Sequence, residues 1–215
     1  MKNLVKKEFA LAMHPTAPLF IALSSMLIIP NYPYLVAFFY IGLSIFFTCL
    51  AGRENNDVFY SMTLPVSKKQ IVAARFIYVI ILELAQIIAS VPFAILRQNM
   101  PVEPNSVGMD AGIALFGFAF ITLAVFNAVF LGSYYKDVKK VGVAFVKSSV
   151  AVFFVIAAVE FMTHVVPFFR DKLDTPDTEY VPEKLIVLAA GAVIYVAVTL
   201  LTYLGAVRNF EKQDI

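Results

Sequence analysis

The chain has 215 residues, of which 60% are hydrophobic and only 15% are charged. A typical soluble domain is about half apolar and about one quarter charged. Apolar stretches of about 20 residues, the length a helix needs to cross about 30 Å of hydrocarbon, recur along the chain. These features exclude an ordinary soluble globular domain. The net charge of +2 gives no argument for nucleic-acid binding, and a lone cysteine, Cys49, cannot form an intrachain disulfide.

The first thirteen residues combine apolar and charged side chains at helical spacing. The apolar positions are Leu4, Val5, Phe9 and Ala12, and the charged positions are Lys2, Lys6, Lys7 and Glu8. Such a pattern is typical of a helix that lies on a membrane surface with one face in the lipid. We therefore predict an amphipathic surface helix over residues 1–13.

The remaining sequence predicts an all-α polytopic membrane protein with six transmembrane helices. The expected spans are residues 14–29, 34–51, 71–96, 111–134, 141–166 and 184–207. The first is the shortest, so it needs residues from Ala10 onward for a full crossing, and Pro15 and Pro18 indicate a kink there. An outer segment with several acidic residues, 167–183, connects the last two spans.

The distribution of positive charge predicts the orientation, because loops rich in Lys and Arg stay in the cytosol. With both termini inside, the cytosolic side holds Lys2, Lys6, Lys7, Arg53, Lys68, Lys69, Arg75, Lys136, Lys139, Lys140, Lys147, Arg208 and Lys212. The outer side then holds only Arg97, Arg170, Lys172 and Lys184. We therefore expect a multi-pass protein of the cell membrane with both termini in the cytosol.

The longest cytosolic connection, residues 53–70, has the composition of a short helix. Asn56 and Asp57 are suitable N-caps, Pro65 ends the helix, and Ser67 can cap the third span. The apolar side chains in this segment are Val58, Phe59, Met62 and Leu64. They lie outside the hydrocarbon and need a partner, which is either the lipid interface or another protein.

This connection resembles that of compact ABC-2-type exporter permeases, in which an acidic segment precedes a Leu-Pro-Val-Ser-basic step into the third helix. The matching residues are Glu54, Asp57, Phe59, Thr63, Leu64, Pro65, Val66, Ser67 and Lys68, followed by Ile71, Val72 and Ala73. The motif covers about twenty residues, and the similarity of architecture covers the entire chain. The resemblance implies that residues 1–215 form a single ABC-2-type transmembrane domain.

The resemblance also implies partners. In that family the segment is a coupling helix that binds a groove of a separate ATPase subunit. By resemblance the residues in contact with the ATPase are Glu54, Asn55, Asp57, Phe59, Tyr60, Met62, Leu64, Pro65 and Ser67. The sequence has Thr63 where serine is common in the family, and Lys68 and Lys69 where an arginine is common, which argues against one specific bidentate contact there. We expect two ATPase subunits that bind ATP and Mg, and a second permease copy, identical or homologous, in the lipid bilayer.

Family resemblance bears on the substrate and the outer segment as well. Similar compact permeases include exporters of amphipathic peptides such as the phenol-soluble modulin exporters, so export of an amphipathic or hydrophobic substrate, such as a toxin or antimicrobial peptide, is an expectation. The family suggests short re-entrant helices within residues 167–183, whereas the composition fits a solvated loop equally well.

Polar residues inside the spans are candidates for the translocation pathway or for helix interfaces, because burying them in lipid is unfavourable. They are Glu83, Gln86 and Ser90 in one stripe, Asn127, and Glu160 with His164 one helical turn later. The stripe fits a pathway or a hydrogen-bonded junction equally well. Asn127 favours an interhelical hydrogen bond. Glu160 and His164 favour pairing with each other or with the outer loop.

The sequence predicts no enzymatic activity for this chain. A zinc site would need a third ligand beside Glu160 and His164, and the other histidine, His14, lies near the opposite membrane face. The sequence has no Gly-rich loop of the GxxxxGK[ST] type, so we expect no metal, no cofactor and no nucleotide bound by the chain itself. Two alternatives remain: a non-transporting membrane anchor or sensor, and a proton-coupled secondary transporter that uses Glu83 or Glu160.

Overall fold

The structure, a computed structural model, describes residues 1–213, and all regular secondary structure among them is helical. Five helices are long and apolar enough to cross a membrane. They are α3 (Leu35–Glu54), α5 (Lys68–Asn99), α6 (Ile113–Tyr134), α7 (Val141–Val165) and α8 (Val181–Glu211). The predicted all-α polytopic fold is therefore confirmed.

The first predicted span is part of a broken helix pair. Helix α1 (Lys2–Lys7) continues as the π-helix η1 (Glu8–Ala12), and α2 (Ala17–Ala22) continues as the 3₁₀-helix η2 (Leu23–Ile28). The two halves meet at a bend of 87°. Residues 10–12 belong to the first half, so they do not extend the crossing as the sequence predicted. Counted as one crossing, the bent pair brings the number of spans to the predicted six.

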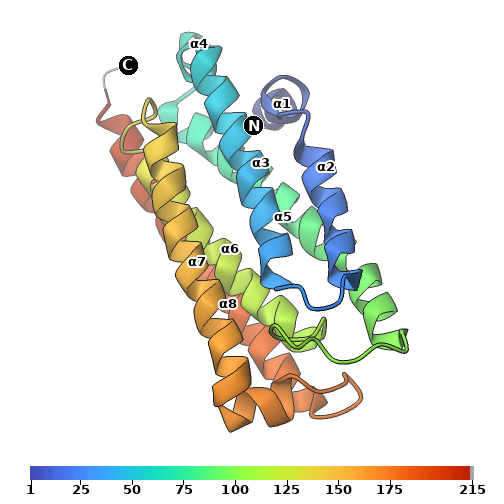
Figure 1. The fold of residues 1–215 in the computed structure, drawn as a ribbon. Helices are drawn as coiled ribbons and strands as arrows, with labels where there is room; N and C mark the ends of the chain where they lie inside the picture. Colours follow the sequence, from blue (N-terminus) through green and yellow to red (C-terminus); the bar gives the residue numbers. More distant parts are fainter. Residues whose placement is uncertain (214–215) are drawn as a thin grey trace.

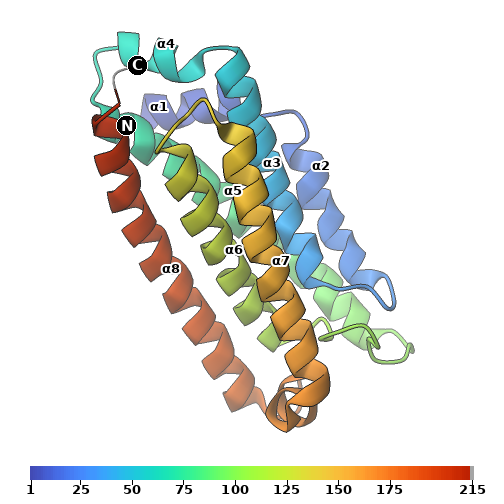
Figure 2. The same ribbon diagram turned by 60° about the vertical axis from the view of Figure 1, so that its left-hand side comes forward.

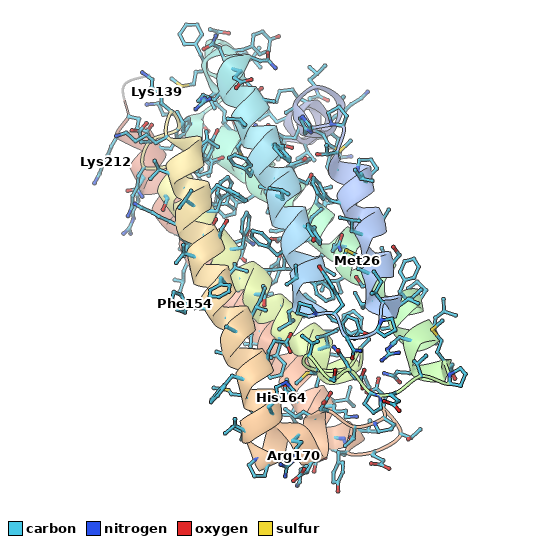
Figure 3. The ribbon with its side chains drawn as sticks, viewed as in Figure 1. Met26, Lys139, Phe154, His164, Arg170 and Lys212 are labelled. Atoms are coloured by element: carbon cyan, nitrogen blue, oxygen red, sulfur yellow. The ribbon has the colours of Figure 1, made fainter. Side chains whose placement is uncertain are left out.

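The chain runs back and forth between two ends of a helical bundle (Figures 1 and 2). We call the end that holds α1, the short helix α4 (Asp57–Thr63) and the C-terminal end of α8 the terminal end. The opposite end holds the connections 29–34, 100–112 and 166–180. Lys139 and Lys212 lie at the terminal end, and His164 and Arg170 lie at the opposite end (Figure 3). The N-terminus and the C-terminal end of α8 therefore lie on one side, as an even number of crossings requires.

Two spanning helices are longer than the sequence predicted. Helix α5 has 32 residues and α8 has 31, against the expected spans 71–96 and 184–207. At 1.5 Å per residue they reach about 48 and about 46 Å, whereas the hydrocarbon core is about 30 Å thick. Each helix therefore extends past the hydrocarbon or tilts within it.

Helices α6 and α8 pack most closely, at a crossing built from two glycines. A Cβ atom on Gly117 would lie 2.6 Å from the carbonyl oxygen of Val187, and a Cβ atom on Gly191 would collide with the backbone of Gly117. Small residues let the backbones of membrane helices approach, and this close approach replaces the hydrophobic driving force that acts in water. The crossing holds α8, the least buried of the spans, on the bundle.

Gly191→Ala is expected to push α6 and α8 apart and to lower stability by about 1–3 kcal/mol, as overpacking of a tight contact does. The measurement is the melting temperature (Tm) of the purified protein in detergent. Gly205→Ala, on the same helix, is the matched control, because its Cβ meets nothing within 4 Å. A Tm for Gly191→Ala at or above that of Gly205→Ala would contradict this account of the crossing.

Candidate functional site

The connection between α3 and α5 forms the predicted short helix, α4, at the terminal end. The helix ends before Pro65, and Ser67 begins α5 with a capping box that includes Gln70. Asn56 occupies the predicted N-cap position of α4, but it has a left-handed backbone (φ 53°) and makes no side-chain capping bond. A capping side chain normally needs extended backbone at that position, which Asn56 lacks.

Helix α4 presents two aromatic side chains to its surroundings: Phe59 is 57% exposed and Tyr60 is 56% exposed. Of the residues expected to contact an ATPase, those exposed are Glu54, Asn55, Phe59, Tyr60, Pro65 and Ser67. Asp57, Met62 and Leu64 are half-buried, and Met62 packs against the hydrophobic core of the bundle. The structure thus divides the predicted set into an outer face and an inner face of one short segment.

A buried group of four charged residues lies beneath α4. We call Lys7, Glu8, Asp57 and Arg75 the terminal ion cluster. The Arg75 guanidinium lies 2.7 Å from a carboxylate oxygen of Glu8 through Nε, and 2.7 Å from one of Asp57 through Nη2. Lys7 Nζ donates to Asp57 Oδ1 at 2.8 Å and lies 3.0 Å from Glu8 Oε1. Arg75 and Glu8 are almost fully buried.

The terminal ion cluster departs from the roles inferred from the sequence. Glu8 was placed among the charged positions of a surface helix and Arg75 among the positive charges of the cytosolic side, yet both are buried and paired. Asp57 was given to the ATPase contact, and in this structure its carboxylate binds Arg75 and Lys7. No local pattern could reveal these pairs, because the partners are 18 to 67 positions apart.

Grooves flank α4 on both sides. One, of about 380 Å³, lies between the η1 region and α4 and is bounded by Leu11, Met13, Asn55 and Tyr60. A smaller one, of about 70 Å³, is bounded by Phe59, Tyr134 and Lys139. The exposed aromatic residues thus stand at the rims of two depressions, an arrangement suited to contact with a second macromolecule.

The sequence model of a family described as ABC-2 family transporter protein matches residues 3–211. The chain belongs to the ABC-2 transporter family. No curated protein and no solved structure matches the chain. The resemblance inferred from the α4 segment is therefore confirmed at the level of the family, and this ABC-2 protein is a multi-pass membrane protein.

In the middle of the bundle, Glu83 joins three helices of this ABC-2 protein. Its Oε2 accepts hydrogen bonds from the Tyr195 hydroxyl at 2.6 Å and from the Asn127 amide at 3.0 Å. Asn127 also donates to the Thr199 hydroxyl at 3.4 Å. All four residues are buried. Asn127 makes the interhelical hydrogen bond that the sequence indicated. Its partner Thr199 and the Glu83 partner Tyr195, one turn apart on α8, were not predicted from the sequence.

The rest of the polar stripe on α5 turns to other neighbours. The Gln86 amide donates to the carbonyl of Ala37 on α3 at 3.2 Å, and the Ser90 hydroxyl contacts Ser24 on η2 at 3.1 Å. Both Gln86 and Ser90 are fully buried. Within this single chain the stripe therefore occupies helix interfaces, the second of the two alternatives that its spacing allowed.

Glu83→Ala is expected to lower stability by about 1–3 kcal/mol, because it leaves the Tyr195 hydroxyl without its acceptor and removes one of the two acceptors of the Asn127 amide inside the bundle. Glu83→Gln keeps an acceptor oxygen and should stay close to the wild-type Tm. Leu84→Ala, at a neighbouring position that is 39% exposed, tests the effect of simple truncation. Equal Tm values for all three variants in detergent would refute the junction.

Glu160 and His164 bind the backbone of the 100–112 connection. Glu160 Oε2 accepts from the amide of Met109 at 3.0 Å, and His164 Nε2 lies 3.1 Å from the carbonyl oxygen of Val107. Gly108 between them leaves room for the Glu160 carboxylate, since a Cβ atom there would collide with it. The sequence favoured pairing of Glu160 and His164 with each other or with an outer loop. In the structure both side chains bind the 100–112 connection, which is a loop of the opposite end. Residues 1–213 contain no group of three metal-ligating side chains.

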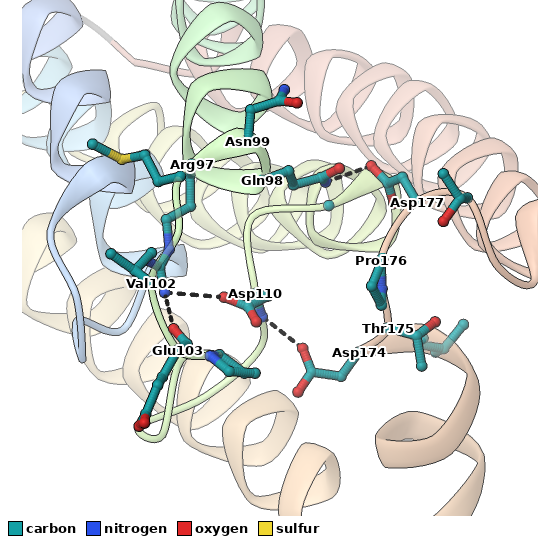
Figure 4. Close-up of a pocket in the computed structure, with 15 residues that line it drawn as sticks. Arg97, Gln98, Asn99, Val102, Glu103, Asp110, Asp174, Thr175, Pro176 and Asp177 are labelled. Carbon is teal, nitrogen blue, oxygen red and sulfur yellow. Dashed lines mark hydrogen bonds and ion pairs between the residues drawn. The ribbon is translucent and has the colours of Figure 1, made fainter.

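Acidic side chains also fasten the 167–183 segment to the opposite end. Asp174 Oδ1 accepts from the amide of Asp110 at 2.6 Å (Figure 4), and Asp177 Oδ1 accepts from the amide of Ile113 at 3.0 Å. Lys184 is fully buried and donates to the Pro176 carbonyl at 2.8 Å. Part of the segment is the π-helix η3 (Phe169–Leu173), so it is a folded element and not a free loop.

Between these connections lies a cavity of about 310 Å³. Arg97 reaches across one wall, donating to the Glu103 carbonyl at 2.7 Å and lying 3.6 Å from Asp110 Oδ1 (Figure 4). Burial raises the pKa of Asp174 to about 6, and the hydrogen bond from the Asp110 amide and the nearby His164 and Lys184 oppose the rise. Burial also raises the pKa of Asp110. The carboxyls of Asp110 and Asp174 at the opposite end therefore lose their protons at a higher pH than ordinary aspartates do.

A pH dependence of stability follows from Asp174. A carboxyl whose pKa is higher in the folded state binds protons more readily there, so the free energy of unfolding falls as pH rises from about 4 to about 6. For this half-buried group the change is on the order of 1 kcal/mol after solvent screening. We expect Asp174→Asn to match wild type at pH 4 and to melt at a higher temperature at pH 7. Parallel Tm curves for the two proteins would contradict the assignment.

Proposed function

We propose that this ABC-2 protein is the membrane-spanning permease subunit of an ATP-driven exporter, with ATP hydrolysis supplied by a separate ATPase subunit. The observation that carries the proposal is α4. It is a short helix at the terminal end that exposes Phe59 and Tyr60 beside the acidic Glu54, in a chain of the ABC-2 family. Aromatic side chains at the rim of grooves are typical anchors of a protein interface.

The orientation follows from the charges. The terminal end carries the basic residues that the sequence assigned to the cytosol, including Lys139 and Lys212, and the opposite end carries few (Figure 3). We therefore place α4 and both chain ends in the cytosol, with the protein in the cell membrane. ATP and Mg then belong to the partner, and this chain has no catalytic role.

The exposed apolar face of α7 and the filled interior of the bundle support an assembly of two permease copies with two ATPase subunits. One face of α7 exposes the large apolar side chains Val146, Val150, Phe153, Phe154 and Phe161. Of these, Phe154 is labelled in Figure 3. Large aromatic side chains such as Phe126 and Phe130 fill the bundle interior. A pathway between two copies, identical or homologous, gives the substrate a route that one filled bundle does not. Its apolar lining would suit an amphipathic or hydrophobic substrate, peptides among them.

Co-purification tests the ATPase partnership. The tagged chain is purified in mild detergent together with the products of its neighbouring genes, as wild type and as Glu54→Ala with Phe59→Ala. We expect stoichiometric ATPase with wild type and a loss of at least most of it with the double variant, because an acidic contact and an aromatic anchor are removed together. Glu179→Ala with Phe168→Ala removes the same residue types at the opposite end and should retain the ATPase.

Co-purification, combined with a transport measurement in vesicles, separates the alternatives. A membrane anchor or sensor would retain the ATPase through α4 but show no transport in vesicles that contain both subunits. A proton-coupled transporter using Glu83 or Glu160 would retain no ATPase in any variant and would transport without ATP. Retention that ignores the α4 changes would remove the main support for the proposal.

A further inference from the structure

The terminal ion cluster has no part in the contacts proposed for α4, yet it ties α4 to the rest of the chain. Its members come from three separate segments: Lys7 and Glu8 from the junction of α1 and η1, Asp57 from the first turn of α4, and Arg75 from α5. Lys7 Nζ also donates to the Ser61 hydroxyl on α4 at 2.9 Å. Thus the surface helix holds α4 at both its first and its second turn.

The geometry of the cluster makes it a stiff link. The Arg75 guanidinium is a planar fork, and two different nitrogens of that fork contact carboxylates on two different segments, each at 2.7 Å. Lys7 closes the group from the other side by approaching both carboxylates. Buried charge pairs of this kind give little net stability, but separating them leaves an uncompensated buried charge. Independent movement of η1, α4 and α5 is therefore strongly unfavourable, because it would separate these buried charges.

The surface helix and α4 also line the same groove. Leu11 on η1 is 78% exposed, and it borders the same groove as Tyr60 on α4. Since the cluster lies just behind this groove, a displacement of α4 must either carry η1 with it or break the contacts of Arg75 with Glu8 and Asp57.

We propose that Arg75 is a positioning residue that transmits displacement of α4 to the surface helix α1–η1 and to the first turns of α5. This inference rests on the proposed function, because the bound ATPase is what displaces α4. Arg75 itself is 4% exposed and would not touch the ATPase. The surface helix is then a moving part of the transporter in addition to a membrane anchor.

The test uses the permease–ATPase complex with a single reporter cysteine. Cys49, the one native cysteine, is buried and is replaced by Cys49→Ser. Leu11→Cys then places a thiol on exposed η1, and its reaction rate with a charged maleimide is measured without nucleotide and after trapping with ATP and vanadate. With an intact cluster we expect a several-fold change in rate on trapping.

Arg75→Lys keeps the positive charge but cannot contact two carboxylates as a fork. It is expected to retain the ATPase like wild type and to lose the nucleotide-dependent change at the Leu11→Cys site. Asp137→Asn, which removes the exposed pair of Asp137 with Lys140 (3.0 Å) at the same end, is the matched control and should keep the change. Retained ATPase with an undiminished change in Arg75→Lys would overturn the inference.

A second measurement leaves the cluster unaltered, in case Arg75→Lys does not fold. Spin labels on Leu11→Cys of η1 and Thr63→Cys of α4, both exposed and both outside the expected ATPase contacts, report the distance between the two segments in the Cys49→Ser background. If η1 and α4 move together, this distance is the same without nucleotide and after trapping with ATP and vanadate. A changed distance in a complex that retains the ATPase would overturn the inference, whereas absence of the ATPase from the wild-type complex would overturn the proposed function itself and the inference with it.

Discussion

The buried guanidinium of Arg75 determines how the terminal end is built. A cation in this position costs several kcal/mol unless carboxylates reach it, and the two that do come from η1 and α4. Glu8 can reach it only because the chain turns by 87° between the surface helix and α2, which lays η1 across the end of the bundle. The short first crossing, the surface helix and the position of α4 are therefore linked parts of one arrangement.

The opposite end meets the same constraint with different chemistry. There the carboxylates of Glu160, Asp174 and Asp177 accept backbone amides, so acidic side chains hold two irregular connections whose own backbone groups lack helical partners. Inside the spans the polar groups are neutral amides and hydroxyls around Glu83. Ion pairs therefore dominate at one end, carboxylate-to-backbone bonds at the other, and interhelical hydrogen bonds between them.

Local information predicted most of the helices and little of their pairing. The expected span 141–166 agrees with α7 to one residue, because hydropathy is a property of the segment itself. The cap at Ser67 was also predicted from its local sequence. Burial of Glu8 and Lys184 was missed, since it depends on partners brought together by the fold. On α4 the sequence indicated apolar residues, but only packing against the bundle decides that Phe59 is exposed and that Met62 lies against the hydrophobic core.

Helix α5 is the element through which the two ends meet. Along its continuous length it carries Arg75 at the terminal end, Glu83 at the central junction and Arg97 at the opposite end, and each of these contacts residues on other segments. Contiguity alone does not make such a helix a pathway, because transmission needs an element with two arrangements. The bent surface helix is the element best suited to that role. It is joined to α5 through Glu8 and Arg75, and its 87° bend sets its direction apart from that of the crossing that follows.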